Sequence, residues 1–349
     1  MKPFEELTRR GRVRRYRQMA QAALAEYGIV DARLMFIRDA GNVTFRVDPL
    51  GRPTLFEDES TRYYRDHCVL RIHEPGYQTD EAITSEIGWL SALCSDTDLA
   101  VPQPVRTLDG ELSVKIQMPG VPEPRRCSLL RWVTGRMLTK NLHPRHFQSL
   151  GWLMAGLHQH AAHWQLPEGF TRPRYDWQGL FGDNDFVKVP SGKVWTSIPP
   201  EYYPAFELVT TKVRGVMGEF GQGTEAFGLI HADIGLGANI LFGGAEARAI
   251  DFDDCAFGYW MFDLGVAFSE VYPDESFAQF KNALLEGYTQ VRSLPEEQWV
   301  HLDLFIATWH AFEMYWATAG AIRFPGSNEA YGRWVDRAAQ DMLHCIERF

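Results

Sequence analysis

The order of strand-like and helix-like segments constrains the fold of this 349-residue chain more than any other feature of its sequence. Up to about residue 130, the apolar residues fall in short runs, some of them alternating with polar residues, which is typical of an antiparallel sheet. The first run turns back on itself around Gly41, which favours two neighbouring strands. We predict strands within residues 34–48, 67–76 and 111–120.

Helical patterns take over in the rest of the chain. One amphipathic helix is expected within the sheet region, at residues 79–96, where apolar residues repeat at helical spacing behind a Thr/Asp cap. The same spacing predicts long helices at residues 146–164 and 202–220, then a hairpin and three further helices. We therefore expect an α+β chain of two lobes, residues 1–130 with a leading helix and a small antiparallel sheet, and residues 131–349, which are larger and mainly helical.

The charge balance argues against a nucleic-acid partner. The chain holds 35 Lys and Arg against 45 Asp and Glu, a formal net charge of -10, whereas nucleic-acid surfaces are basic. The one basic run, residues 9–20, continues at helical spacing and is typical of a surface helix. We expect no membrane span, because no apolar run reaches about 18 residues. The five scattered cysteines favour reduced thiols in a cytoplasmic protein, and no pattern indicates an oligomeric state.

The segment with the most polar chemistry is residues 231–254, HADIGLGANILFGGAEARAIDFDD. Two apolar runs flank GGAE, which predicts a two-stranded hairpin. If the loop spans about five residues, Phe242 faces Arg248 across the hairpin.

The same register brings three polar side chains together. Asn239 would lie directly opposite Asp251, where cross-strand Cβ atoms are about 4.5 to 5.5 Å apart. Oxygen ligands from one Asn and one Asp suit Mg²⁺ better than a transition metal. We expect both residues to share that ion, and Asp233, in the loop before the hairpin, to face the ion or a substrate hydroxyl.

HADIGLGAN is similar to the catalytic loop, and AIDFDD to the metal-binding strand, of the phosphotransferase family that includes aminoglycoside phosphotransferases, choline kinases and type II homoserine kinases. That resemblance implies a protein-kinase-like fold and transfer of the γ-phosphate of ATP, with Mg²⁺, to a hydroxyl. It implies that Asp233 positions the hydroxyl and takes its proton, and that His231 braces the loop. Asn239 and Asp251 would hold Mg²⁺. Asp263, in FGYWMFDLG, resembles the helix-start aspartate that ties to the catalytic loop.

Segments of the first lobe resemble the parts of this family that bind the nucleotide. VLRIHEPG is similar to the strand that bears a phosphate-anchoring cation, here Arg71, with Glu86 as its implied ion-pair partner. FIRDAGNVTFRV resembles the loop over the phosphates, with Gly41 and Asn42 at its tip.

SLLRWVTG resembles the hinge that hydrogen-bonds adenine, here through backbone groups near Arg131 and Val133. The likeness runs from about residue 33 to 270. It implies that residues 1–130 form the nucleotide-binding lobe and that residues 131–349 carry the catalytic loop and the acceptor site.

Three positions depart from the family pattern. Arg71 stands where lysine is commoner, and its planar fork can grip phosphate and a carboxylate together. Asp233 and Asn239 are six residues apart where five is usual, so we expect the loop to bulge. DFD replaces DFG, and the twelve residues from Asp251 to Asp263 leave no room for a phosphorylated activation loop.

Other interpretations of these residues stay open. His231 and Asp233, with His310, match the ligands of a non-haem iron site. His160 and His163 on one predicted helix could bind zinc. A relative that binds nucleotide without transferring phosphate is the main alternative that is not an enzyme.

The acceptor is expected to carry a positive charge. Acidic and aromatic side chains near the second half of the motif favour an amine-bearing hydroxyl compound, such as an amino alcohol, amino sugar or hydroxy amino acid, by charge pairing and cation–π attraction. A protein serine or threonine is the alternative acceptor. The residues concerned are Asp253, Asp254, Glu270, Trp309, Glu313 and Trp316.

Overall fold

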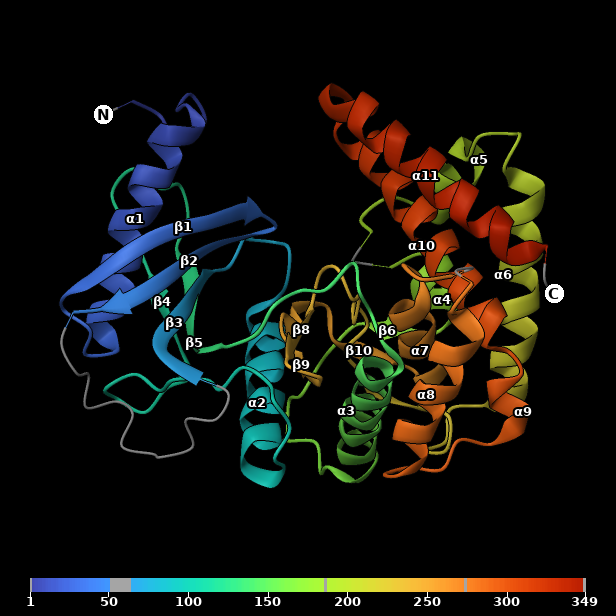
Figure 1. Cartoon of the computed structure of the whole chain (residues 1–349). Helices are drawn as coiled ribbons and strands as arrows, with labels where there is room; N and C mark the ends of the chain where they lie inside the picture. The colour runs from blue at the N-terminus through green and yellow to red at the C-terminus, as the bar shows by residue number, and fades with distance from the viewer. Residues whose placement is uncertain (1, 51–63, 185–186, 273–274, 348–349) are drawn as a thin grey trace. The chain divides into compact units, whose positions relative to one another are not determined.

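The structure, a computed structural model, describes residues 2–50, 64–184, 187–272 and 275–347. The chain divides into two compact units, drawn in Figure 1. The first comprises Met1–Thr134 and Pro167–Thr171, and the second comprises Gly135–Leu166 and Arg172–Phe349. The short segment Pro167–Thr171 joins the first unit partly because the Thr171 N–H donates to Ser85 Oγ at 2.9 Å.

The first unit contains a five-stranded sheet in the order β1-β2-β3-β5-β4, and every neighbouring pair is antiparallel. This confirms the predicted antiparallel sheet. Between β1 and β2 the chain turns at Gly41, whose φ of +70° suits glycine. The strands are β1 (Ala32–Ala40), β2 (Asn42–Pro49), β3 (Tyr64–Ile72), β4 (Ser113–Ile116) and β5 (Arg125–Val133), and the helices are α1 (Arg9–Glu26) and α2 (Asp80–Asp96).

Helix α1 is both a charged surface and part of the core. Its arginines at 9, 10, 12 and 14 are exposed, as expected of the basic run. Its other face buries Met19, Ala23 and Leu24 in one apolar cluster with Phe45 and Leu70 of the sheet. Figure 1 shows the helix running along the sheet. The basic run therefore belongs to a helix that helps to close the core of this unit.

The second unit is mainly helical. Its helices are α3 (Pro144–His163), α4 (Trp177–Phe181), α5 (Ser191–Ser197), α6 (Tyr203–Phe220), α7 (Trp260–Phe268), α8 (Phe277–Thr289), α9 (Glu296–Trp299), α10 (Leu302–Arg323) and α11 (Asn328–Ile346), with 3₁₀ turns η1 (Phe252–Asp254) and η2 (Pro325–Ser327). A small sheet has the order β6-β10-β7, from β6 (Arg174–Tyr175), β7 (Phe227–Ile230) and β10 (Ala256–Tyr259). The hairpin consists of β8 (Ile240–Gly243) and β9 (Glu246–Ala249).

Two helix pairs, α3 with α8 and α10 with α11, pack side by side in this unit (Figure 1). Glycines allow the first pair to approach closely, because a Cβ at Gly151 would lie 2.0 Å from Leu284 O and one at Gly287 would lie 1.8 Å from Gln148 O. The predicted number of helices after the hairpin was wrong: the described residues form five α-helices there, not three. Nine consecutive buried residues in α7 have no helical periodicity, and α9 is a single turn after a proline.

The hairpin register differs from the prediction by one residue. Phe242 pairs with Ala247 and Leu241 with Arg248, and the Ile250 N–H donates to Asn239 O at 2.9 Å. The turn has two residues rather than five, because Gly244 adopts a φ of +72° and permits a tight connection. Asn239 therefore lies across from Ile250, not Asp251.

All five cysteines are free thiols. Burial raises the pKa of the Cys68 thiol and that of the Cys127 thiol to about 12. In the part of the chain that the structure describes, no helix combines the length and apolar character needed to cross a membrane.

Candidate active site

A buried aspartate holds the backbone at the start of the loop that begins at His231. Asp263, in the first turn of α7, accepts the His231 N–H at 2.9 Å through Oδ2 and the Ala232 N–H at 2.7 Å through Oδ1. Ala232 has a φ of +70°, a conformation that is costly for a residue with a Cβ. These two bonds hold the backbone in that conformation, as the resemblance implied for Asp263.

A buried histidine in turn holds Asp263. His158 of α3 bonds through Nε2 to Asp263 Oδ2 at 3.1 Å, and its Nδ1 accepts the Tyr288 hydroxyl at 2.9 Å. Its ring stacks on Trp260, with centroids 4.7 Å apart. Burial lowers the pKa of His158, which keeps one ring nitrogen as an acceptor. Three helices, α3, α7 and α8, thus converge on one carboxylate.

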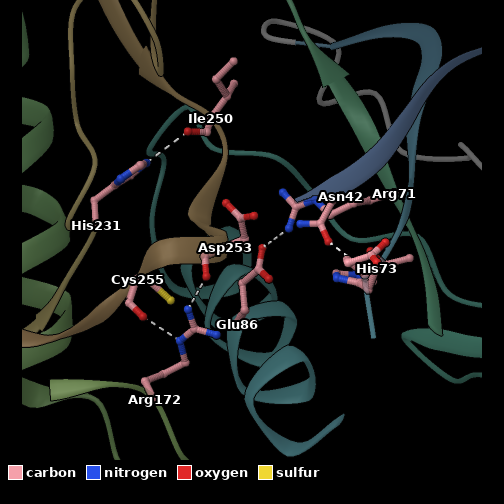
Figure 2. A network of polar contacts seen from close by, with 11 residues as sticks. Asn42, Arg71, His73, Glu86, Arg172, His231, Ile250, Asp253 and Cys255 are labelled. Atoms are coloured by element: carbon pink, nitrogen blue, oxygen red, sulfur yellow. Dashed lines mark hydrogen bonds and ion pairs between the residues drawn. The ribbon is translucent and has the colours of Figure 1, made fainter. Parts of the chain in front are cut away.

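The ring of His231 links the loop to the strand after the hairpin. Its Nε2 donates to Ile250 O at 3.0 Å, the bond drawn in Figure 2, and its Nδ1 accepts the Asp233 N–H at 3.3 Å. The ring also packs on Phe252, with centroids 4.5 Å apart. His231 therefore fixes the backbone of Asp233 relative to the segment that carries Asp251.

Asn239 contacts Asp233 directly despite the longer spacing. Its Nδ2 donates to Asp233 Oδ2 at 2.7 Å and to Asp233 O at 2.8 Å. Because both bonds use the amide nitrogen, the orientation of the amide is fixed. Within the described residues, Oδ1 of Asn239 accepts no hydrogen bond, so it is the atom available to a cation.

The extra residue of the loop is taken up in a tight turn. Gly235 O accepts the N–H groups of Ala238, Asn239 and Ile240 at 3.3, 2.9 and 3.2 Å. Both carboxylate oxygens of Glu270 accept the Gly237 N–H at 2.9 Å. A Cβ on Gly237 would lie 2.6 Å from Glu270 Oε2, so a larger residue would displace that carboxylate. Glu270, expected near the acceptor, contacts the backbone of this loop.

Asp251 is the first residue of the acidic segment 251–254, and its backbone is left-handed, with a φ of +66°. The chain then forms η1 and enters β10. Burial raises the pKa of Asp233 well above its usual range, and the negative charges of Asp254, Asp251 and Glu313 raise it further. These four carboxylates therefore lie within electrostatic range of one another.

The raised pKa predicts a stability effect in the metal-free protein. The folded state holds the Asp233 proton more tightly than the unfolded state, so ionisation of Asp233 costs stability as pH rises above the unfolded pKa of about 3.9. We expect Asp233→Asn to raise Tm by about 2 °C or more at neutral pH, with little gain near pH 4. Thermal unfolding in EDTA at several pH values measures this, and a lower Tm for the variant at neutral pH would contradict it.

In the first unit, Arg71 and Glu86 form the expected ion pair. Arg71 Nη1 lies 2.6 Å from Glu86 Oε1, and the two side chains are 6% and 1% exposed. Figure 2 draws this ion pair. Thr44 and Ser128 lie beside Arg71 on the neighbouring strands β2 and β5. The pair links β3 to α2 and gives the guanidinium a fixed position.

The remaining residues predicted to bind nucleotide lie in different surroundings. The exposed Gly41 has open space around its Cβ position. The side chain of Asn42 is buried, and its Oδ1 accepts the Glu74 N–H at 3.1 Å. The Arg131 N–H donates to Gln103 O at 2.8 Å and is therefore already bonded, and Val133 lies opposite Tyr64 at the end of β5.

The histidines of the alternative metal sites do not converge. In the described portion of the chain, no group of three or more His, Cys, Asp or Glu side chains is arranged to hold a metal ion. His231, Asp233 and His310 therefore form no iron triad, and His160 and His163 form no zinc site. The predicted pair Asn239 and Asp251 contains an amide and therefore does not belong to these groups.

Helix α10 presents a narrow accessible stripe. From residue 304 to 320, every residue is buried except Trp309, Glu313 and Trp316, which are partly exposed. Glu313 accepts the Trp334 indole N–H of α11 at 3.2 Å and contacts His310 Nδ1 at 3.2 Å. Trp309, Glu313 and Trp316 are the residues expected near the acceptor, and the negative charge of Glu313 contributes to the raised pKa of Asp233.

One site residue escaped the sequence analysis. Arg172 is buried and donates through Nε to Cys255 O at 2.6 Å and through Nη2 to Asp253 O (Figure 2). These contacts span more than eighty residues and reach backbone oxygens, so no motif in the sequence could reveal them.

The fold and the anchored loop define a phosphotransferase of the protein-kinase-like fold. Residues 55–302 match the family described as "Phosphotransferase enzyme family", and this chain belongs to that family. It is therefore a kinase-type transferase with an alcohol group as acceptor. No protein with a curated description matches the chain.

Solved structures share the fold over nearly the whole chain. A microcompartment-associated aminopropanol kinase is 26% identical, with a TM-score of 0.72 over 93% of this chain and 95% of that one. An amicoumacin kinase in complex with AMP-PNP and Ca²⁺ is 18% identical, with a TM-score of 0.71 over 96% of each chain. A choline kinase from Cryptosporidium parvum is 16% identical, with a TM-score of 0.56 over 90% of this chain and 89% of that one.

Proposed function

We propose that this chain transfers the γ-phosphate of ATP, with Mg²⁺, to a hydroxyl of a small amine-bearing molecule. The observation that carries the proposal is the fixed position of the Asp233 carboxylate. Asn239 holds its Oδ2, His231 holds its N–H, and Asp263 holds the backbone that precedes it.

Asp233 would bind the acceptor hydroxyl and take its proton. A base with a raised pKa accepts a proton more readily once it is ionised, and a positioned base is worth about 10² to 10⁴ in rate. His231 would not touch the substrate. Its role would be to hold the loop at the correct distance from Ile250.

The residues present fit a Mg²⁺ ion. Asn239 Oδ1 and the Asp251 carboxylate are oxygen donors, which Mg²⁺ prefers, and two protein ligands leave room for water and phosphate. When bound, the ion would neutralise phosphate charge. Asn239 lies across from Ile250, and the left-handed Asp251 is the next residue in the chain, so both side chains belong to the same end of the β8–β9 hairpin.

Nucleotide binding would fall to the first unit. The Arg71 guanidinium, fixed by Glu86, would contact phosphate, and the turn at Gly41 and Asn42 would cover it through backbone N–H groups. The backbone at Val133 would bond adenine. Catalysis would then rest mainly on positioning and charge neutralisation.

The α10 stripe supports an amine on the acceptor. Glu313 offers a carboxylate near Asp233, and Trp309 and Trp316 flank it at helical spacing. Cation–π attraction to such rings is worth about 0.5 to 2 kcal/mol. The name of the aminopropanol kinase, the relative at 26% identity, points to an acceptor with both an amine and a hydroxyl.

A matched pair of acceptors tests this proposal. An amino alcohol and a diol of the same length carry the same hydroxyl, and we expect turnover of the amine alone at millimolar concentration. Glu313→Gln should raise KM for the amine by about tenfold, since an ion pair to a partly buried carboxylate is lost, with a smaller effect on kcat. Glu329→Gln, on α11 with a side chain 90% exposed, is the control and should leave KM unchanged. Equal use of the diol would contradict the amine assignment.

A further inference from the structure

The segment that carries the proposed metal ligand has an unusual backbone. Asp251 is left-handed, η1 follows at once, and Cys255 closes that turn by donating its N–H to Phe252 O at 3.0 Å. Carbonyl groups at the end of a short turn lack partners within it. Side chains or water bind such carbonyl groups in proteins.

Arg172 binds those carbonyls. Its guanidinium reaches Cys255 O and Asp253 O from outside the turn, as Figure 2 shows, and the residue is only 6% exposed. A guanidinium presents its donors in a rigid fork, so it can hold two backbone oxygens at once. A burial of this extent also shields the bonds from water.

The same guanidinium also places a positive charge near several aspartates. Burial raises the pKa of Tyr175 well above its usual range, the charges of Asp254, Asp233 and Asp253 raise it further, and Arg172 opposes them. Tyr175 therefore lies within electrostatic range of three carboxylates and of the Arg172 guanidinium. Bringing these carboxylates together costs less with that cation beside them.

We infer that Arg172 is a positioning residue for the metal-binding segment. It holds the turn after Asp251 so that the carboxylate keeps the geometry needed to bind a divalent cation beside Asn239, and it offsets the repulsion among the neighbouring acids. The inference rests on the proposed function, because it assigns the cation to Asp251 and Asn239.

Direct metal binding tests the inference without an activity assay. Mn²⁺ binding in the presence of a non-hydrolysable ATP analogue is followed by electron paramagnetic resonance for the native protein and for Arg172→Met, Arg172→Gln and Arg172→Lys. We expect the Mn²⁺ Kd to rise about tenfold or more in Arg172→Met. Arg172→Lys should recover part of the loss, because it keeps the charge but not the fork.

The matched control is Arg174→Met. Arg174 lies two residues away, has a side chain 48% exposed and bonds Asp176 and Gln222 instead of the metal segment, so the Mn²⁺ Kd should stay unchanged. If Arg172→Met does not fold, Arg172→Lys and Arg172→Gln carry the test. In activity assays, the apparent KM for Mg²⁺ should rise more than the KM for the acceptor.

The outcomes separate the two proposals. A folded Arg172 variant with native Mn²⁺ affinity would overturn this inference and leave the proposed function intact. A native protein that binds no Mn²⁺ with the nucleotide analogue would overturn the metal assignment itself, and this inference with it.

Discussion

Asp233→Asn should lower kcat by about 100-fold or more while nucleotide binding stays close to native. The amide can still contact a hydroxyl but cannot take its proton, and the loss of a positioned base costs about 10² to 10⁴. Asn239, His231 and Asp263 fix the position of residue 233 through contacts that an isosteric amide can largely keep. Steady-state turnover at saturating ATP and acceptor measures the effect.

The expected rise in Tm serves as the control for folding. A variant that is more stable and yet nearly inactive separates catalysis from structure. Full turnover by Asp233→Asn would remove the assignment of the base. A loss of nucleotide binding along with activity would show that Asp233 acts through the nucleotide site.

Asp251→Asn should abolish the stabilisation that ATP gives in the presence of Mg²⁺. A ligand at about 100 times its Kd adds about 2.7 kcal/mol to the free energy of unfolding, which raises Tm by several degrees. The neutral amide is a weaker ligand for Mg²⁺ than a carboxylate. Thermal unfolding of the native chain and of the variant measures this effect. Each protein is unfolded with ATP alone, with Mg²⁺ alone, and with ATP and Mg²⁺ together.

Asp109→Asn provides a matched control, because Asp109 is exposed and lies in the first unit. It should keep the native response to ATP with Mg²⁺. Equal stabilisation of the native protein and Asp251→Asn by ATP without Mg²⁺ would instead favour a relative that binds nucleotide but does not transfer phosphate.

Contacts within short motifs could be predicted from the sequence. Arg71 and Glu86 lie fifteen residues apart on a strand and the following helix, and their ion pair forms as expected. The same is true of Asp263, whose carboxylate accepts two N–H groups of the loop. In both cases the residue types and the order of the elements leave few possible arrangements.

The register of the hairpin could not be predicted in the same way. GGAE allows a two-residue or a longer turn, and the positive φ of Gly244 decides between them. A one-residue shift moves a side chain to the other face of a strand. Asn239 nevertheless contacts Asp233 in this register, and the turn before the hairpin holds its backbone, since the Asn239 N–H donates to Gly235 O.

Long-range contacts to the backbone were beyond the reach of the sequence. Arg172 binds carbonyl oxygens more than eighty residues away, and any residue could supply those oxygens. His158 is similar, since its role depends on α3, α7 and α8 meeting at Asp263. The roles of such residues can be recognised only once the three-dimensional arrangement of the helices is known.

Transfer of phosphate itself tests the central claim most directly. Phosphorus NMR of the native protein with ATP, Mg²⁺ and an amino alcohol follows the γ-phosphate. We predict a phosphomonoester signal that grows with ADP, requires Mg²⁺ and falls by about 100-fold or more in rate with Asp233→Asn. Binding of ATP and Mg²⁺ without a phosphomonoester of any hydroxylated amine would contradict the account.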